Sequence, residues 1–144
     1  MSEFPAMRKK KYVIDEAAAW DILCSEAVEF GFLGVCGLDG DGGYPYIVPM
    51  NFTADRESGK IFFHTTMDAQ SRRNRTLAAN DKACFTVVTP DSHIVPGPED
   101  MPACKFSMKF ESVVVLGDVS EVTDVDEKMK ILELMMSQKC GSRK

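Results

Sequence analysis

The sequence lacks long apolar runs, a secretory leader and an excess of positive charge. No apolar run approaches the ~20 residues of a membrane-spanning helix, and no apolar segment of the secretory type follows the charged N-terminal stretch. The net charge of −5 at pH 7 disfavours a general nucleic-acid binder, because such proteins are normally basic. These absences predict a soluble, cytoplasmic protein that binds neither membranes nor nucleic acid.

Cysteine pairs in metal or redox spacing are also missing. The chain has five cysteines, an odd number, and no C-x-x-C motif. This usage indicates reduced thiols and not a disulfide framework. No histidines and cysteines have zinc spacing, so we expect no metal site. Cys36 and Cys84 fall in apolar stretches, where we expect buried thiols.

The composition that is present supports one folded domain. With 144 residues, 44% of them apolar, the chain has the length and apolar content for a single domain over residues 1–144. Residues 1–14 are expected to form an N-terminal arm. Asp15 is placed to cap a helix that has Gly31 just past its end. The apolar face of this helix would consist of Trp20, Leu23, Ala27 and Phe30.

The rest of the chain is predicted to be mostly strands. Three apolar runs joined by short turns indicate an antiparallel meander over residues 32–38, 44–54 and 60–66. Further strands are expected at 83–89 and 104–122, a proline-rich loop at 90–102, and helices over 71–80 and after the capping box of Asp124 and Glu127. The predicted fold class is mainly β with peripheral helices. Strands this apolar indicate a closed barrel or a face buried in a dimer.

The segment around Ser71 predicts an anion site. If Ser71 caps the helix, Arg72 and Arg73 occupy its first turn, where the positive end of the helix dipole disfavours cations. A bound anion would reverse that effect, and free N–H groups, a hydroxyl and guanidinium groups suit a phosphate. The alternative is a solvated arginine cluster on a poorly optimised helix.

Two strands beside this segment carry further candidates. Pro45 and Pro49 interrupt the ladder of one strand, so its backbone groups are open to a planar ligand, or the strand is simply an irregular edge. In the next strand, alternation puts Ile61 and Phe63 on the core face and His64 on the opposite face. His64 then either adjoins a ligand or satisfies a backbone group at the barrel rim.

Taken together, these motifs resemble the pyridoxamine 5′-phosphate oxidase-like, flavin-binding split barrels, and within them the branch of the nitroimidazole-resistance reductases. Most of the chain is covered. The matching stretches are Met7-Arg8-Lys9-Lys10, Asp15-Glu16-Ala17, Gly43 to Phe52, Gly59 to His64, Asn80 to Phe85 and Phe110 to Gly117. Two departures are a Thr65–Ser71 stretch without the glycine–lysine pattern of relatives, and an end soon after the last helix, where relatives have a further strand.

The resemblance implies an antiparallel split barrel that binds flavin mononucleotide (FMN) as a homodimer. The backbone of Val48, Pro49, Met50, Asn51 and Phe52 would face the flavin ring, and Phe63, His64, Thr65 and Thr66 would continue along it. Ser71, Arg72 and Arg73 would bind the phosphate. Phe110, Glu111 and Ser112 would approach from the second subunit.

The function implied is an oxidoreductase that reduces small acceptors such as nitroaromatics with a nicotinamide donor, NAD(P)H. The flavin carries the redox chemistry, so no protein nucleophile is needed. His64 is the candidate catalytic residue, because a neutral imidazole both donates and accepts a hydrogen bond. The alternatives are a non-catalytic flavin-binding or redox-sensing protein, and a split barrel that binds haem.

Overall fold

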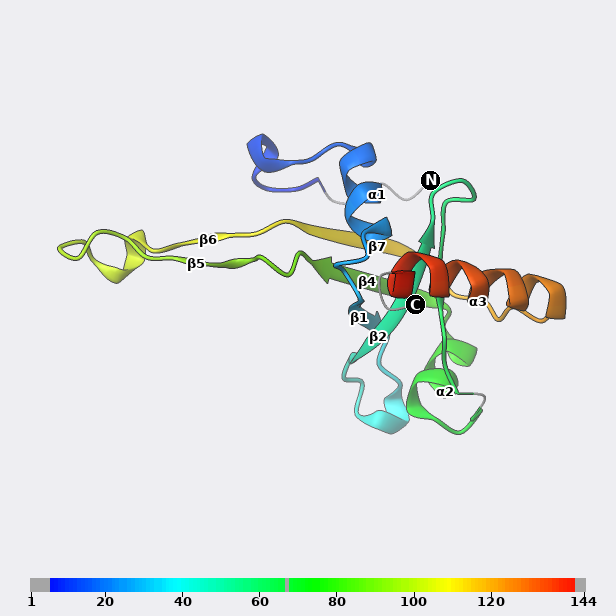
Figure 1. Cartoon of the computed structure of the whole chain (residues 1–144). Helices are drawn as coiled ribbons and strands as arrows, with labels where there is room; N and C mark the ends of the chain where they lie inside the picture. The colour runs from blue at the N-terminus through cyan, green and yellow to red at the C-terminus, as the bar shows by residue number, and fades with distance from the viewer. Residues whose placement is uncertain (1–5, 67, 142–144) are drawn as a thin grey trace.

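A computed structural model describes residues 6–66 and 68–141, and shows an antiparallel five-stranded sheet that curls into a half-barrel (Figure 1). The strands are β1 (Phe30–Val35), β2 (Tyr46–Asp55), β3 (Lys60–Phe63), β4 (Lys82–Val88) and β7 (Ser112–Asp118), in the order β3-β2-β1-β4-β7. The helices are α1 (Glu16–Cys24), α2 (Arg72–Ala79) and α3 (Val125–Cys140). The mainly β split-barrel class predicted from the sequence is confirmed.

The predicted meander of the first three strands is also confirmed, and β2 changes partner halfway along it. Residues Tyr46 to Asn51 pair with β1, whereas Phe52 to Asp55 pair with β3. β3 ends at Phe63, opposite Phe52. The first half of β2 therefore has a ladder partner on one side only.

The core lies on one face of the sheet. Leu33, Phe52 and Val87 are at most 2% exposed. Phe85 packs edge-on against both Phe52 and Phe63, with ring centroids 4.9 Å apart in each pair. Ile61 and Phe63 pack against this core, as the alternation predicted.

The opposite face of the sheet is apolar and exposed. Directly opposed residues of neighbouring strands share a face, and the register joins Phe32 to Thr86 and Thr86 to Val114. A parallel row runs from Ile47 through Gly34 and Cys84 to Leu116. We call this surface, with Phe30, the outer face. Its large side chains are 46–64% exposed.

The predicted burial of the two strand cysteines is wrong for Cys36, which is exposed just beyond the end of β1. Cys84 lies on the outer face and is half-buried. Both residues are in apolar sequence, but the described parts of the chain cover only one face of the sheet.

Helix α1 is shorter than predicted. Asp15 caps it, accepting a hydrogen bond from the backbone N–H of Ala18, but the helix ends at Cys24 and Gly31 lies inside β1. A Cβ at position 31 would stand 2.5 Å from Cζ of Phe85, so glycine is needed there for close approach of two strands and not as a helix end.

The end of α1 is fixed by a residue far away in the sequence. The buried ammonium group of Lys139, on α3, donates to the carbonyl oxygens of Leu23, Ser25 and Val28 at 2.8–3.0 Å. It also lies 4.3 Å from the ring centroid of Phe52. Burial lowers the pKa of Lys139 to about 8. This contact holds α3, α1 and the core together.

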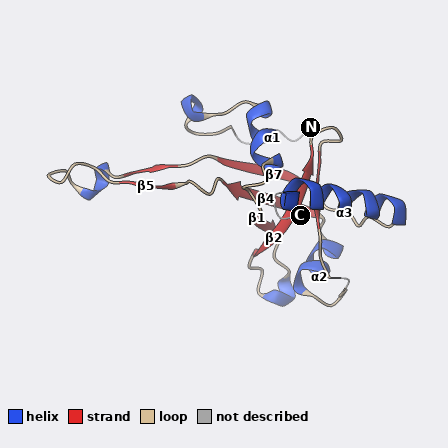
Figure 2. Cartoon of the chain, in the orientation of Figure 1, coloured by secondary structure: helices blue, strands red, loops and turns tan. Residues whose placement is uncertain are grey.

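The predicted strand over 104–122 is wrong, because it is broken at Phe110 and Glu111. Its first part, β6 (Ser107–Lys109), pairs with β5 (His93–Val95), which lies in the predicted loop over 90–102. The two form a hairpin that projects from the body between β4 and β7 (Figure 2). We call residues 89–111 the arm. Residues 1–5 of the predicted N-terminal arm lie outside the described residues; Lys10–Tyr12 form one exposed 3₁₀ turn.

Candidate functional site

The candidate site lies where the first half of β2, residues 64–66 and 68–71, and the start of α2 come together. β3 ends at Phe63, and the chain then runs to Ser71. The guanidinium of Arg72 stacks on the ring of Tyr46, 4.6 Å from its centroid, and donates to the carbonyl of Tyr44 at 3.4 Å. These contacts place the start of α2 beside the start of β2.

The α2 N-terminus forms as predicted. Ser71 is the N-cap, and its hydroxyl accepts from the backbone N–H of Asn74 at 3.2 Å. The side chain of Asn74 donates to the carbonyls of Asp68 at 2.7 Å and Thr66 at 3.3 Å. The capping interactions therefore also fix the loop that precedes the helix.

Arg73 is a cation at this helix start whose charge is not paired with a carboxylate in the described chain. Its guanidinium donates to the hydroxyl of Thr65 and, through Nε, to the side-chain oxygen of Asn74 at 3.3 Å. It is half-buried, and it makes no ion pair within the described parts of the chain. A cation near the positive end of a helix, without a carboxylate, favours a bound anion.

Arg72 has other partners. Its Nε lies 3.6 Å from Oδ2 of Asp41, and Arg75 Nη2 lies 3.5 Å from Oδ1 of the same carboxylate. The three residues proposed for the phosphate thus divide into Ser71 and Arg73 on the side of Thr65, and Arg72 on the side of Asp41. Asp41 and Tyr46 were not among the residues predicted for the site. The spacing of Arg72 and Arg75, three residues apart, was the available signal for a shared anionic partner.

His64 does not lie in a strand, so the alternation argument does not apply to it. The predicted strand over 60–66 ends at Phe63, and His64, Thr65 and Thr66 are exposed in the loop that follows. The pairing of β2 with β3 ends where Phe52 lies opposite Phe63.

The β2 candidates contribute unequally. Met50 and Phe52 point into the core, at 7% and 0% exposure, so only their backbone can meet a ligand. Val48 is half-buried. Pro49 and Asn51 are exposed, and the side-chain amide of Asn51 donates to the carbonyl of Glu29 at 3.2 Å.

Phe110, Glu111 and Ser112 lie at the other end of the sheet. Ser112 pairs with Val88, the last residue of β4, whereas α2 leads directly into the first residue of β4, Lys82. β4 has seven residues, which span ~20 Å at about 3.3 Å per residue. One chain therefore does not bring this segment to the α2 site.

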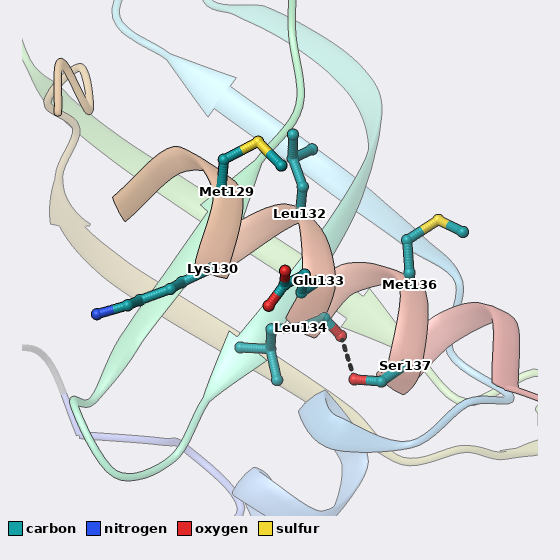
Figure 3. A pocket seen from close by; sticks show the side chains of 7 residues that line it. All are labelled: Met129, Lys130, Leu132, Glu133, Leu134, Met136 and Ser137. Carbon is teal, nitrogen blue, oxygen red and sulfur yellow. Dashed lines mark hydrogen bonds between the residues drawn. The ribbon is translucent and has the colours of Figure 1, made fainter. Parts of the chain in front are cut away.

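Two hollows lie elsewhere on the described chain, and one of them, between α1 and the start of the arm, is lined by residues that include Ile22, Val28 and Pro90. A shallow hollow runs along α3, lined by seven residues of that helix alone, of which Met129, Leu132 and Met136 are exposed (Figure 3). Within residues 6–66 and 68–141, no cluster of three or more His, Cys, Asp or Glu residues could hold a metal ion. None of the helices described has the length and apolar character needed to cross a membrane.

The sequence profile of the pyridoxamine 5′-phosphate oxidase family matches residues 15–143. The chain belongs to this family. The match covers every strand of the half-barrel, both sides of the α2 site and the arm. No curated protein matches the sequence.

Solved structures resemble this one in fold. A candidate 5-nitroimidazole antibiotic resistance protein from Bacteroides thetaiotaomicron has 25% identity and a TM-score of 0.67, over 88% of this chain and 67% of its own. A heme binding protein from Mycobacterium smegmatis has 16% identity and a TM-score of 0.55, over 91% of this chain. A protein of unknown function from Agrobacterium tumefaciens has 14% identity and a TM-score of 0.53, over 92% of this chain. The chain spans about half the length of the last two, at 46% and 50%.

Proposed function

We propose that this family member binds FMN and works as an oxidoreductase that reduces small electron acceptors, such as nitroaromatics, with a nicotinamide donor. The observation that carries the proposal is the half-buried cation of Arg73 at the capped start of α2, with no carboxylate partner in the described chain. The family match and the likeness to a candidate nitroimidazole-resistance protein support the choice of ligand and reaction class.

The chain offers suitable groups to two parts of FMN, the phosphate and the polar edge of the ring. Arg73, Ser71 and Thr65 suit the phosphate, since they supply a guanidinium and two hydroxyls beside free helix N–H groups. The singly paired half of β2, from Val48 to Asn51, suits the polar edge of a planar ring through its backbone groups. When bound, FMN supplies the hydride and electron transfer, and the protein supplies binding and orientation.

A second copy of the chain is part of the proposal. The outer face is a contiguous apolar surface of the kind that marks an interaction site. Phe110, Glu111 and Ser112 are too far from α2 within one chain to share its ligand. An isologous homodimer would cover the outer face and let these residues reach the partner's site.

The absorbance spectrum of the purified protein is the first test. Flavin bands would support the proposal, and a Soret band would replace it with haem binding. A spectrum with neither kind of band would contradict both flavin and haem binding. Reduction of a nitroaromatic by a nicotinamide donor then separates an enzyme from a flavin-binding or redox-sensing protein.

Arg73→Ala tests the phosphate contact. Loss of a charge-assisted hydrogen bond costs ~1.5–3 kcal/mol, so FMN should bind about 10- to 100-fold more weakly. Riboflavin, which lacks the phosphate, should bind almost as before. Arg56→Ala is the control, since Arg56 pairs with Asp21 away from the site. Equal losses for both ligands would contradict the assignment.

His64 is proposed to contact the substrate or the flavin edge. Its exposed ring follows the end of β3 and precedes the phosphate candidates in the same loop. In the same assays, His64→Ala should keep FMN bound and lower the turnover per bound flavin. A lower melting temperature with unchanged turnover would assign His64 a structural role instead.

A further inference from the structure

Asp41 lies between two arginines of α2. Its carboxylate stands 3.6 Å from Nε of Arg72 and 3.5 Å from Nη2 of Arg75. The side chain of Asp41 is 21% exposed, and those of Arg72 and Arg75 are 36% and 42% exposed. Oδ2 of Asp41 is itself buried and makes no hydrogen bond to the described residues. The carboxylate is thus a shielded charge that the two guanidinium groups neutralise.

The loop between β1 and β2 fixes this carboxylate. Asp41 closes a 3₁₀ turn over Asp39–Asp41, and its N–H donates to the carbonyl of Leu38 at 3.0 Å. Gly42 and Gly43 follow with positive φ of 77° and 75°, a backbone conformation that favours glycine. The turn therefore presents Asp41 to α2 from a defined direction.

The three arginines of α2 are divided by this contact. Residues three apart lie on one helix face, so Arg72 and Arg75 both reach Asp41. Arg73, one residue on from Arg72, is rotated by ~100° and bonds Thr65 instead. Without Asp41, Arg72 and Arg75 would keep only uncharged partners within the described chain, the carbonyls of Tyr44 and Gln70 and the ring of Tyr46, so their charge would no longer be neutralised.

We propose that Asp41 is a specificity-determining residue: by engaging Arg72 and Arg75, it leaves one guanidinium for the ligand and favours a single phosphate monoester over a diphosphate. A diphosphate carries more negative charge and needs more cations than Arg73 alone supplies. The inference rests on the proposed function, since it concerns how many guanidinium groups the same phosphate site offers to its ligand.

The test compares inorganic phosphate and pyrophosphate, each titrated calorimetrically into the protein. In Asp41→Asn, the preference for pyrophosphate over phosphate should rise about 10- to 100-fold, the worth of one added charge-assisted contact. Asp39→Asn is the matched control. It removes the same charge from the same turn, and within the described chain Asp39 makes no ion pair. Asp39→Asn should leave the preference unchanged.

Asp41→Ser removes the charge by a second route and has to give the same rise. Arg75→Gln should keep the wild-type preference, because Asp41 still engages Arg72. An unchanged preference in the Asp41 variants, or an equal rise in Asp39→Asn, overturns the inference. If wild-type protein binds FMN while this preference does not move, only the role of Asp41 fails. If wild-type protein does not bind FMN, the proposed function itself fails.

Discussion

On one face of the sheet, Leu33, Phe85 and Val87 are 1–3% exposed, whereas on the other face Phe32, Ile47 and Val114 are 46–64% exposed. The residue types on the two faces are similar, and they alternate along the same strands. One face is covered by α1, α3 and the curl of the sheet itself. The large side chains on the other face remain exposed among the residues that the structure describes. Side chains of the covered face stabilise the fold of one chain, whereas those of the outer face are the ones proposed to contact a second chain.

The largest expected effect is on the covered face. Leu33→Ala should lower the free energy of unfolding by ~2–5 kcal/mol, because it removes buried methyl groups and leaves a cavity. Chemical denaturation followed by circular dichroism measures this loss. A loss below ~1 kcal/mol would mean that the core collapses around the gap, and that the two faces differ less than their exposure indicates.

An intermediate effect is expected on the outer face. Phe32→Asp and Ile47→Asp should convert a dimer into a monomer, because each places a charge in the proposed apolar interface. Sedimentation at micromolar concentration reports the association state. Lys130→Asp, on an exposed turn of α3, is the control and should leave association unchanged. A wild-type monomer with FMN bound would contradict the role of the outer face as a dimer interface, since this apolar face would then be stable in contact with water.

The last expected effect concerns Lys139, the cation on the covered side. Burial lowers the pKa of Lys139 from 10.5 to about 8. Between these values the unfolded chain holds more protons than the folded one, so stability should rise with pH across that window. In Lys139→Met, the free energy of unfolding should no longer increase in this way with pH. Lys130 is an exposed lysine of the same helix, so Lys130→Met should keep the increase. Unfolding measured from pH 7 to 11 in all three proteins tests the difference.

Local patterns in the sequence predicted the elements that local physics controls. Asp15, Ser71 and Asp124 cap the three helices as expected, each accepting from a backbone N–H three residues on. The alternation around Ile61 and Phe63 identified their shared core face. These features depend on hydrogen bonds or periodicity within a few residues, so a single sequence is sufficient to find them.

Features set by tertiary contacts were missed. The end of α1 depends on Lys139, which is more than a hundred positions away, and the break at Phe110 depends on the pairing of β5 with β6. The candidate site shows the same limit. Ser71 and its helix start were predictable, but the contact of Arg72 and Arg75 with Asp41 requires the β1–β2 loop to fold back onto α2.

The arm also affects the order in which the sheet can assemble. β4 and β7 are adjacent in the sheet, yet residues 89–111 separate them in the chain. Closing such a loop costs chain entropy before any β4–β7 contact forms, and that cost grows with loop length. β5 and β6 lie inside the loop and pair with each other. If this hairpin forms first, fewer unpaired residues remain in the loop that must close between β4 and β7. We therefore expect the arm hairpin to form before β4 pairs with β7, which would lower the entropy cost of closing this edge of the half-barrel.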